Sequence, residues 1–372
     1  MVSPLMNTDR GSQSLLLDGK RLSPQDLTRM LEAGEAAHTC EMWDLLQFLA
    51  RWFDPSPTLT VHTSGSTGTP KAIVVNKAQM IQSARLTCEF LKLQPGDSAL
   101  LCMNLRYIGA MMMVVRSLVA GLDLSVRPAS GHPLAEVTRP PRFAAMVPLQ
   151  VYNTLHTPEE RTRLAQTGIL IIGGGAIDAT LERELQSLPG EIYSTYGMTE
   201  TLSHIALRRL NGPAISDHYQ PFDTVALSLS AEGTLVINAP LVCDQVLHTN
   251  DMARLYPDGS FTILGRKDNV INSGGIKIQA EEVEKALYPL IPVPFAITSV
   301  DDARLGQAVT LLVQQDSSPK GELQEVETLK QLIRRHLPPY HCPRHILFVP
   351  QLPMTGNGKI DRNACRSLAL LK

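Results

Sequence analysis

Short apolar runs and amphipathic stretches alternate along the first half of the chain. The runs are rich in aliphatic and β-branched residues and predict strands at residues 99–103, 122–126, 143–147 and 169–172. Apolar residues at helical spacing predict helices between these runs, at about 76–92 and 107–120. Strands that alternate with helices in this way form a parallel sheet with helices on its faces. The pattern therefore predicts an α/β fold.

Polar residues at the helix starts agree with this assignment. Asn76 is a good N-cap for the first of these helices. Thr157, followed by Pro158 and Glu160, predicts a capping box at the start of another helix. Two further helices are predicted near the N-terminus, at residues 23–33 and 41–52.

The pattern changes beyond residue 205, where short strands are separated by glycine and proline turns. From about residue 269 a smaller unit begins, with a two-stranded piece and then a helix from Ala280. A strand pair over 295–315, a helix over 322–336 and a terminal strand and helix complete this unit. The sequence therefore predicts a large domain over residues 1–267 and a small α+β domain over residues 268–372.

Composition excludes several classes of function. The chain has 372 residues, of which 44% are hydrophobic and 19% charged, and its net charge of -2 gives no field for nucleic acid. The six cysteines include no CxxC pair, which argues against a zinc site or a disulfide framework. The N-terminus lacks a signal pattern, and the longest apolar run, 108–122, is interrupted by Arg116. We therefore expect a soluble, cytoplasmic protein with no stable membrane insertion.

The stretch from Val61 to Lys71 reads VHTSGSTGTPK and is the strongest chemical signal in the chain. Its glycines and small hydroxyl residues allow several backbone N–H groups and O–H groups to surround an anion. Lys71 adds the positive charge that a polyphosphate would use. A Walker loop needs Gly before the lysine and a hydroxyl residue after it, whereas Pro70 and Ala72 stand here. The flanking runs also predict a strand on each side of the loop.

Four more stretches of unusual residues follow in order. They read GGGAID from Gly173, YSTYGMTET from Tyr193, TNDMARL to GRKDNVINSGG over 249–275, and PMTGNGKIDR from Pro353. With the loop at 63–71, this order resembles the adenylate-forming superfamily of acyl-CoA synthetases, peptide-synthetase adenylation domains and luciferases. The resemblance covers about residue 60 to the C-terminus, and five ordered matches are far more specific than one. It implies a large layered α/β domain followed by a small mobile domain.

The resemblance implies ATP, Mg2+ and CoA as the participants of a ligase reaction on a small carboxylic acid. The phosphates would bind to Thr63, Ser64, Gly65, Ser66, Thr67, Gly68 and Lys71, and Thr63 would also act in catalysis. Glu200 would hold the magnesium ion and would also act in catalysis, since a hard cation prefers an acidic oxygen ligand. The rest of the nucleotide would contact Gly174, Gly175, Ala176, Tyr196, Gly197, Met198, Thr199, Asp251 and Arg266.

The resemblance also implies a change of conformation between two half-reactions. Asp268 corresponds to the hinge about which the small domain rotates, and Lys359 would swing in to bridge the carboxylate and the α-phosphate. Gly274 and Gly275, which lack side chains, would let a strand of the small domain approach the acyl and CoA site.

The chain departs from the superfamily pattern in its N-terminal half. About sixty residues precede the phosphate loop, fewer than in full-length relatives, where this region contributes part of the acid pocket. The segment that usually reads Pro-Leu-x-His runs here from Asn104 to Gly109, which makes Tyr107 the candidate gate of the acid pocket. A tyrosine that simply packs at a helix start is an equally good interpretation. A milder departure is Asn250 before Asp251, where glycine is commoner.

Within the superfamily, the residues after Glu200 look most like those of o-succinylbenzoate–CoA ligases of menaquinone synthesis. That acid has a second carboxylate, so a polar or basic group is expected deep in its pocket, and Ser203, His204 or Arg208 could supply it. A histidine beside a strand is often just a hydrogen-bonded structural residue, which stays open here. Two other functions also stay open, a stand-alone adenylation domain that loads a carrier protein and a non-catalytic nucleotide-binding relative. The sequence leaves a homo-oligomer open as well.

Overall fold

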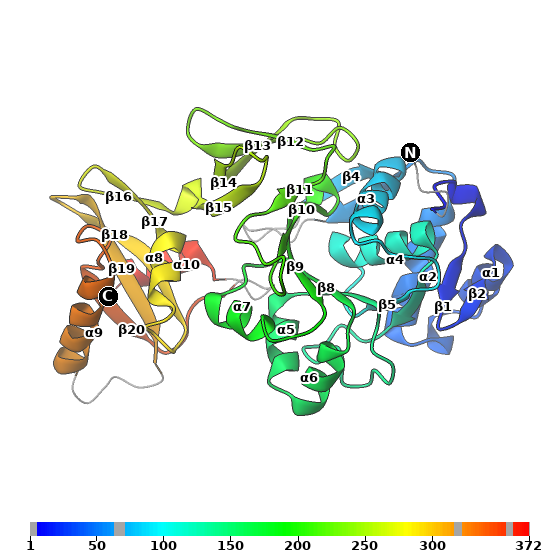
Figure 1. Cartoon of the computed structure of the whole chain (residues 1–372), viewed down its shortest axis with the longest axis horizontal. Coiled ribbons are helices and arrows are strands. Elements are labelled where there is room, and N and C mark those ends of the chain that lie inside the picture. Colours follow the sequence, from blue (N-terminus) through cyan, green and yellow to red (C-terminus); the bar gives the residue numbers. More distant parts are fainter. Residues whose placement is uncertain (1–5, 63–70, 316–321, 355–359, 372) are drawn as a thin grey trace. The chain divides into compact units, whose positions relative to one another are not determined.

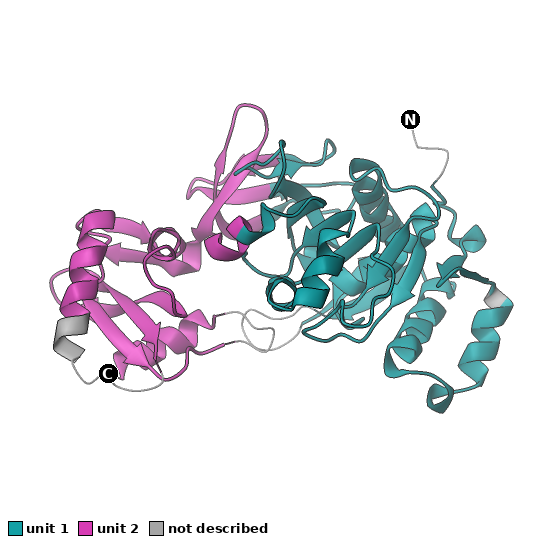
Figure 2. Cartoon of the chain, turned by 60° about the horizontal axis from the view of Figure 1, so that its bottom comes forward, with its two compact units in different colours: residues 1–177, 184–226, 237–247 teal, residues 178–183, 227–236, 248–372 magenta. Residues whose placement is uncertain are grey.

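The computed structural model describes residues 6–62, 71–315, 322–354 and 360–371. The chain divides into two compact units, drawn in two colours in Figure 2. Unit 1 comprises residues 1–177, 184–226 and 237–247, and unit 2 comprises residues 178–183, 227–236 and 248–372.

A large mixed sheet forms the centre of unit 1. Its strands are β1 (Leu15–Leu17), β2 (Lys20–Leu22), β5 (Ser98–Leu101), β6 (Asp123–Val126), β7 (Phe143–Met146), β8 (Ile169–Ile172), β9 (Glu191–Gly197), β10 (His204–Arg209) and β11 (Gln220–Pro221). They lie in the order β11-β10-β9-β8-β7-β5-β6-β1-β2 (Figure 1). Neighbours from β1 to β9 are parallel, as the sequence predicts, whereas β2, β10 and β11 pair antiparallel at the two edges.

Helices before residue 190 include several that the sequence predicts. They are α1 (Pro24–Glu32), α2 (Cys40–Phe53), α3 (Lys77–Phe90), α4 (Ile108–Ala120), α5 (Pro148–Leu155), α6 (Pro158–Ala165) and α7 (Ala179–Leu185). All residues of α4 from Ala110 to Ala120 are buried, which explains the long apolar run in the sequence as a core helix. Arg116 is the one ionisable residue in that buried stretch.

A separate hairpin frames the predicted phosphate loop. Its antiparallel strands are β3 (Thr58–His62) and β4 (Ala72–Asn76). As predicted, the side chain of Asn76 caps α3 by accepting a backbone N–H of the first turn at 2.8 Å. The next residue, Lys77, is buried and its Nζ donates to the Asp54 carboxylate at 2.7 Å. The base of the hairpin is thus fixed to the end of α2.

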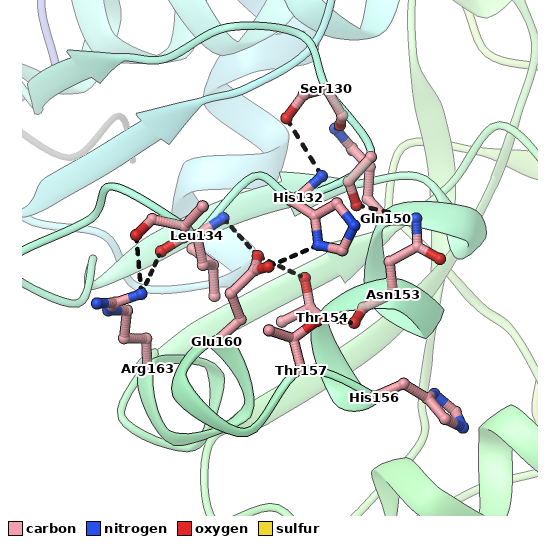
Figure 3. A network of polar contacts seen from close by, with 12 residues as sticks. Ser130, His132, Leu134, Gln150, Asn153, Thr154, His156, Thr157, Glu160 and Arg163 are labelled. Carbon is pink, nitrogen blue, oxygen red and sulfur yellow. Dashed lines mark hydrogen bonds and ion pairs between the residues drawn. The ribbon is translucent and has the colours of Figure 1, made fainter.

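Glu160 does not form the capping box that the sequence predicts. Thr157 makes no side-chain cap bond, because its hydroxyl donates to the carbonyl of Asn153 at 3.0 Å. The buried Glu160 carboxylate instead accepts from Nδ1 of His132 at 2.7 Å and from the backbone N–H of Leu134 at 3.0 Å (Figure 3). Glu160 therefore bonds to residues distant in the sequence and not to the first turn of its own helix. These bonds attach α6 to the connection between β6 and β7.

Two further sheets lie wholly or mainly in unit 2 among the described residues. In the first, β12 (Ala226–Leu229), β13 (Thr234–Asn238), β14 (Leu247–Leu255) and β15 (Phe261–Arg266) pair in that order. The second sheet has the order β17-β16-β19-β18, with β20 beside β19. Its strands are β16 (Val270–Ser273), β17 (Ile276–Gln279), β18 (Phe295–Asp302), β19 (Gly306–Gln314) and β20 (His345–Val349).

The C-terminal helices close a core of their own against this second sheet. They are α8 (Ala280–Leu287), α9 (Glu322–His336) and α10 (Arg362–Leu370). Val283 and Leu287 of α8 and Ile333 of α9 belong to one buried apolar cluster with Ile297 and Leu311 from the strands. The predicted α+β character of this region is confirmed.

The two units agree with an α/β protein that has a larger N-terminal and a smaller C-terminal part. The β12–β15 sheet lies mainly in unit 2, although Ala226 and residues 237–247 belong to unit 1, and the boundary between residues 267 and 268 stays a prediction. Among the described residues, no helix combines the length and the apolar character that a membrane crossing requires.

Candidate active site

The predicted phosphate loop joins β3 to β4, so that the expected strand on each side is present. Lys71 lies exposed directly before β4. Thr63, Ser64, Gly65, Ser66, Thr67 and Gly68 lie outside the described residues. Because the ends of the hairpin pair in register up to His62 and Ala72, the loop begins and ends at one point, as a phosphate-wrapping loop requires.

The glycine run follows β8 at the carboxyl edge of the sheet, where ligands of such sheets bind. A Cβ on Gly173 would lie 2.4 Å from Oγ1 of Thr195 on the neighbouring strand, so a larger residue fits only if the Thr195 side chain shifts. Gly174 has φ +79°, which also favours glycine. Gly175 and Ala176 continue this turn, and the backbone of the segment is open to close approach.

Strand β9 delivers the next group of predicted residues. Tyr196 and Gly197 end the strand, and a 3-10 helix follows over Thr199–Thr201. A Cβ on Gly197 would lie 2.0 Å from the carbonyl oxygen of Ser203, so this glycine is required for β9 and β10 to meet. Met198 begins the turn, and its backbone N–H donates to Oγ1 of Thr201 at 3.0 Å.

Glu200 lies in this 3-10 helix with its side chain exposed. The described residues contain no group of three or more His, Cys, Asp and Glu side chains that could hold a metal ion. Mg2+ is commonly held by one or two carboxylates together with substrate phosphates, so a single accessible Glu200 fits such an ion. When bound with the nucleotide, the ion would supply positive charge to the phosphates.

Asp251, Arg266 and Asp268 are brought together in unit 2. Asp251 on β14 stands opposite Arg266 on β15, and their Oδ1 and Nη1 atoms are 3.1 Å apart. Nη2 of Arg266 also lies 3.1 Å from Oδ2 of Asp268. The strand register therefore assembles the residues that the resemblance assigns to the ribose and the hinge. Asn250 joins them, since its amide donates to Oδ2 of Asp268 at 3.2 Å.

Gly274 and Gly275 form the turn of the β16–β17 hairpin. Their φ values are +61° and +82°, and Ser273 pairs with Ile276 across them. A two-residue turn with two positive φ values is the type I′ turn that suits a hairpin. The turn alone explains why both residues are glycines. The approach of this strand to an acyl site stays a prediction.

Lys359 lies outside the described residues, but the ends of its segment are fixed. Met354 and Ile360 form a β-bridge, and the N–H of Asp361 donates to the carbonyl of Pro353 at 2.9 Å. The ends of the TGNGK stretch are thereby held together.

Arg116, Ser203 and His204 form a group that we call the Arg116 cluster. Its buried cation was missed by reasoning from the sequence. Arg116 on α4 is 1% exposed, and its Nη2 donates to Oγ of Ser203 at 2.8 Å. Its Nε finds no hydrogen-bond partner among the residues that the structure describes. Burial lowers the pKa of Arg116 to about 10, which leaves it charged at neutral pH. The sequence offered one signal for Arg116, a charged residue inside a predicted apolar helix.

Two predicted pocket residues join this cluster and two do not. Ser203 contacts Arg116, and Nδ1 of His204 lies 3.2 Å from Oγ of Ser203. Arg208 is placed elsewhere, with its guanidinium 5.6 Å from the ring centre of Tyr219. Tyr107 precedes α4 and is 48% exposed, so it is not packed in a core.

Comparison with known proteins identifies the family. The AMP-binding enzyme family matches residues 9–232, and the C-terminal domain of AMP-binding enzymes matches residues 282–359. The chain belongs to the AMP-binding enzyme family. The predicted adenylate-forming fold is thereby confirmed, and the chain is an enzyme of the AMP-forming ligase type.

Several individual proteins of this family are similar to the chain. A solved acyl-CoA synthetase (AMP-forming)/AMP-acid ligase II-like protein from Dyadobacter fermentans is 32% identical, with a TM-score of 0.61 over 91% of this chain and 97% of that one. A probable 2-succinylbenzoate–CoA ligase from Mycobacterium tuberculosis is 29% identical over 84% of each chain. The Bacillus subtilis o-succinylbenzoate–CoA synthetase structure, solved with its acyl-adenylate intermediate, is 21% identical, with a TM-score of 0.67 over 82% of this chain and 68% of that one.

Proposed function

We propose that this AMP-binding enzyme is an ATP-dependent acid–CoA ligase and that its acid is 2-succinylbenzoate. Relatives at 25–29% identity over most of the chain carry the name 2-succinylbenzoate–CoA ligase, which supports this acid. The observation in the structure that carries the proposal is Arg116, a buried cation whose Nε has no partner among the described residues. It needs an anion, and an acid with two carboxylates can supply one.

The surroundings of Arg116 support a bound anion rather than an internal one. Isolated buried charges cost several kcal/mol unless they are paired. Burial raises the pKa of the neighbouring Cys88 to about 12, so this thiol stays neutral and does not compensate the guanidinium. Ser203 offers a hydroxyl and no charge. One carboxylate of the acid would pair with Arg116, while the other reacts with ATP.

The reaction then follows the chemistry of the predicted residues. An oxygen of the reacting carboxylate attacks the α-phosphate of ATP, and pyrophosphate leaves with its charge balanced by Lys71 and the phosphate loop. The thiolate of CoA next attacks the acyl carbon, and AMP leaves. Asp251 would hold the ribose hydroxyls, Glu200 the magnesium ion, and Lys359 the developing charge during adenylation. We place the reaction in the cytoplasm, where ATP and CoA are both available.

The test combines an acid panel with one variant. Wild-type protein is incubated with ATP, Mg2+, CoA and either 2-succinylbenzoate or acids with a single carboxylate, and thioesters are identified by mass. We expect a thioester of 2-succinylbenzoate. In Arg116→Met, kcat/KM for this acid should fall by about 100-fold, which corresponds to ~2.7 kcal/mol. Because the variant removes an unpaired buried charge, its melting temperature should not fall.

One control variant and three possible outcomes decide against or for this proposal. Arg161→Gln changes an exposed arginine of α6, outside the segments assigned to the site, and should leave kcat/KM within twofold. Absence of AMP with every acid would show that the protein is a non-catalytic relative. Pyrophosphate exchange without a CoA thioester would indicate loading of a carrier protein instead. Unchanged use of 2-succinylbenzoate by Arg116→Met would rule out the role of this arginine.

A further inference from the structure

A series of hydrogen bonds joins four buried residues, Arg116, His204, Thr87 and Ser83, through the half-buried Ser203. Nη2 of Arg116 on α4 lies 2.8 Å from Oγ of Ser203, which lies 3.2 Å from Nδ1 of His204 at the start of β10. Nε2 of His204 lies 3.0 Å from Oγ1 of Thr87 on α3. The Thr87 hydroxyl donates to the carbonyl oxygen of Ser83 at 3.1 Å. We call these four contacts the Arg116–Ser83 series.

The last member fixes the direction of the bonds in the series. The carbonyl oxygen of Ser83 can only accept, so the single hydroxyl proton of Thr87 is directed to it, and Oγ1 of Thr87 accepts from Nε2–H of His204. A neutral imidazole with its proton on Nε2 has an accepting Nδ1, so the hydroxyl of Ser203 donates to it. A guanidinium has only donors, so Oγ of Ser203 also accepts from Arg116. With a neutral imidazole, one arrangement of protons satisfies all four contacts.

We propose that His204 is a positioning residue for recognition of the acid. As the neutral Nε2–H tautomer it holds the Ser203 hydroxyl, and Ser203 orients the Arg116 guanidinium so that Nε–H faces the second carboxylate of the acid. His204 has this role only if the proposed function is right, because the acid supplies that carboxylate. The histidine itself touches neither ATP nor the reacting carboxylate in this scheme.

The surroundings of His204 keep it neutral. Burial lowers the pKa of His204 well below its ordinary value, and the positive charge of Arg116 lowers it further. The Phe222 ring, whose centre is 5.7 Å from the imidazole centre, adds an apolar neighbour. Cys88 on α3 is a neutral thiol, since burial raises its pKa to about 12. A second positive charge next to Arg116 is therefore disfavoured.

The backbone before His204 is built to hold these side chains. Leu202 is buried and has φ +64°, a strained conformation for a non-glycine residue. The hydroxyl of Thr201 donates to the carbonyl of Ser203 at 2.7 Å. The register with β9 then shifts between His204 and Ala206. Strain and a bulge in a sheet occur where a side chain must be aimed, and here they aim Ser203 and His204.

The tautomer can be measured directly in the full-length wild-type protein without substrate. Two-bond 1H–15N correlation spectra of protein with 15N-labelled histidine distinguish Nδ1–H, Nε2–H and doubly protonated rings. The signals of His204 are assigned as those that His204→Asn removes. We expect Nε2–H at pH 7 and at pH 6. A proton on Nδ1, or a doubly protonated ring at pH 7, overturns the proposal.

Three substitutions at one position test the effect on specificity. The measured quantity is kcat/KM for 2-succinylbenzoate divided by kcat/KM for analogues that lack one of its two carboxylates. His204→Leu removes both ring nitrogens. We expect the ratio to fall by about tenfold, which is the free-energy equivalent of one hydrogen bond between a charged group, here Arg116, and the carboxylate. His204→Asn keeps an acceptor near the position of Nδ1 and should restore the ratio to within about threefold. His204→Gln keeps the distal donor alone and should not restore it.

The outcomes separate this proposal from the proposed function. A general loss of structure at His204 would lower the use of every acid equally and leave the ratio unchanged, which overturns the positioning role. Equal behaviour of His204→Asn and His204→Gln overturns it too. If the wild-type protein makes a 2-succinylbenzoate thioester and the ratio stays constant, the proposed function stands and the role of His204 falls. If no such thioester forms, both fall.

Discussion

At the scale of single residues, the site depends on positions where a side chain is either forbidden or enclosed. A Cβ on Gly197 would collide with the backbone of the following turn, and a Cβ on Gly173 would meet the Thr195 side chain on the neighbouring strand. Arg116 and His204 are enclosed polar groups within an otherwise apolar region. The sequence showed the glycines inside recognisable motifs. In the sequence, Arg116 stands out only as a charged residue that interrupts an apolar run. Its burial and the missing partner of its Nε are consequences of packing.

Gly197→Ala tests the close approach of β9 to the following turn. The new methyl group would lie 2.0 Å from the Ser203 carbonyl oxygen and 2.5 Å from Cα of His204, and both are backbone atoms that cannot move aside freely. We expect a loss of about 1–3 kcal/mol in the free energy of unfolding, measured in urea, together with reduced activity. Gly109→Ala is the control, because nothing lies within 4 Å of its Cβ position. A change below ~0.5 kcal/mol in Gly197→Ala would contradict the steric argument.

At the scale of elements, helix and strand starts are anchored by partners far away in the sequence. The sequence predicted the cap at Asn76, because a cap is a local interaction between a side chain and the following turn. It was wrong at Thr157 and Glu160, because His132 and Leu134 compete successfully for the carboxylate. Such competition depends on which loop lies next to the helix, and local rules do not contain this information.

Glu160→Ala should release the β6–β7 connection. It removes the acceptor for the backbone N–H of Leu134 and for Nδ1 of His132, and it leaves a buried donor without a partner. We expect the free energy of unfolding to fall by about 2–3 kcal/mol, and amide hydrogen exchange to accelerate at Leu134. Glu159→Ala, one residue away on the exposed side of α6, should change stability by less than ~0.5 kcal/mol. Equal effects of the two substitutions would contradict the buried role.

The anchor of the phosphate hairpin should give a pH-dependent contribution to stability. The hydrogen bond from Lys77 holds the pKa of Asp54 below its ordinary value. A carboxylate with a lowered folded pKa contributes stability above its unfolded pKa, and this contribution is lost as the pH falls through the folded pKa. We expect Asp54→Asn to be less stable than wild type at pH 7 and the difference to shrink below pH 4 in urea titrations. Asp44→Asn, on α2, is the control and should change the free energy of unfolding at pH 7 by less than ~0.5 kcal/mol.

At the scale of the whole molecule, the proposed reaction uses residues from both units. Unit 1 carries the phosphate hairpin, the glycine turn, Glu200 and the Arg116 cluster. Unit 2 carries Asp251, Arg266 and the fixed ends of the segment that contains Lys359. The rotation about Asp268 between the half-reactions, which the resemblance to the adenylate-forming superfamily implies, stays a prediction.

Lys359→Ala tests this rotation by separating the half-reactions. Exchange of pyrophosphate into ATP, which reports adenylation, should fall by at least about 100-fold, since a cation at the developing charge contributes ~2.7 kcal/mol or more. Thioester formation from supplied acyl-adenylate and CoA should continue at a rate near that of wild type. Lys285→Ala, an exposed lysine of α8, should affect neither step. Loss of both steps, or of neither, would count against a two-conformation mechanism.

The sequence by itself determined the periodicity of the elements, the α/β class, the order of the motifs and hence the family. These features are local, because each depends on residue types within a few positions of one another. The tertiary structure decided which strands close the sheet at its edges, where Glu160 points, and that Arg116, Ser203, His204 and Thr87 meet. These residues come from segments up to 117 positions apart. Contacts over such separations follow from packing of whole helices and strands, and no local pattern specifies them.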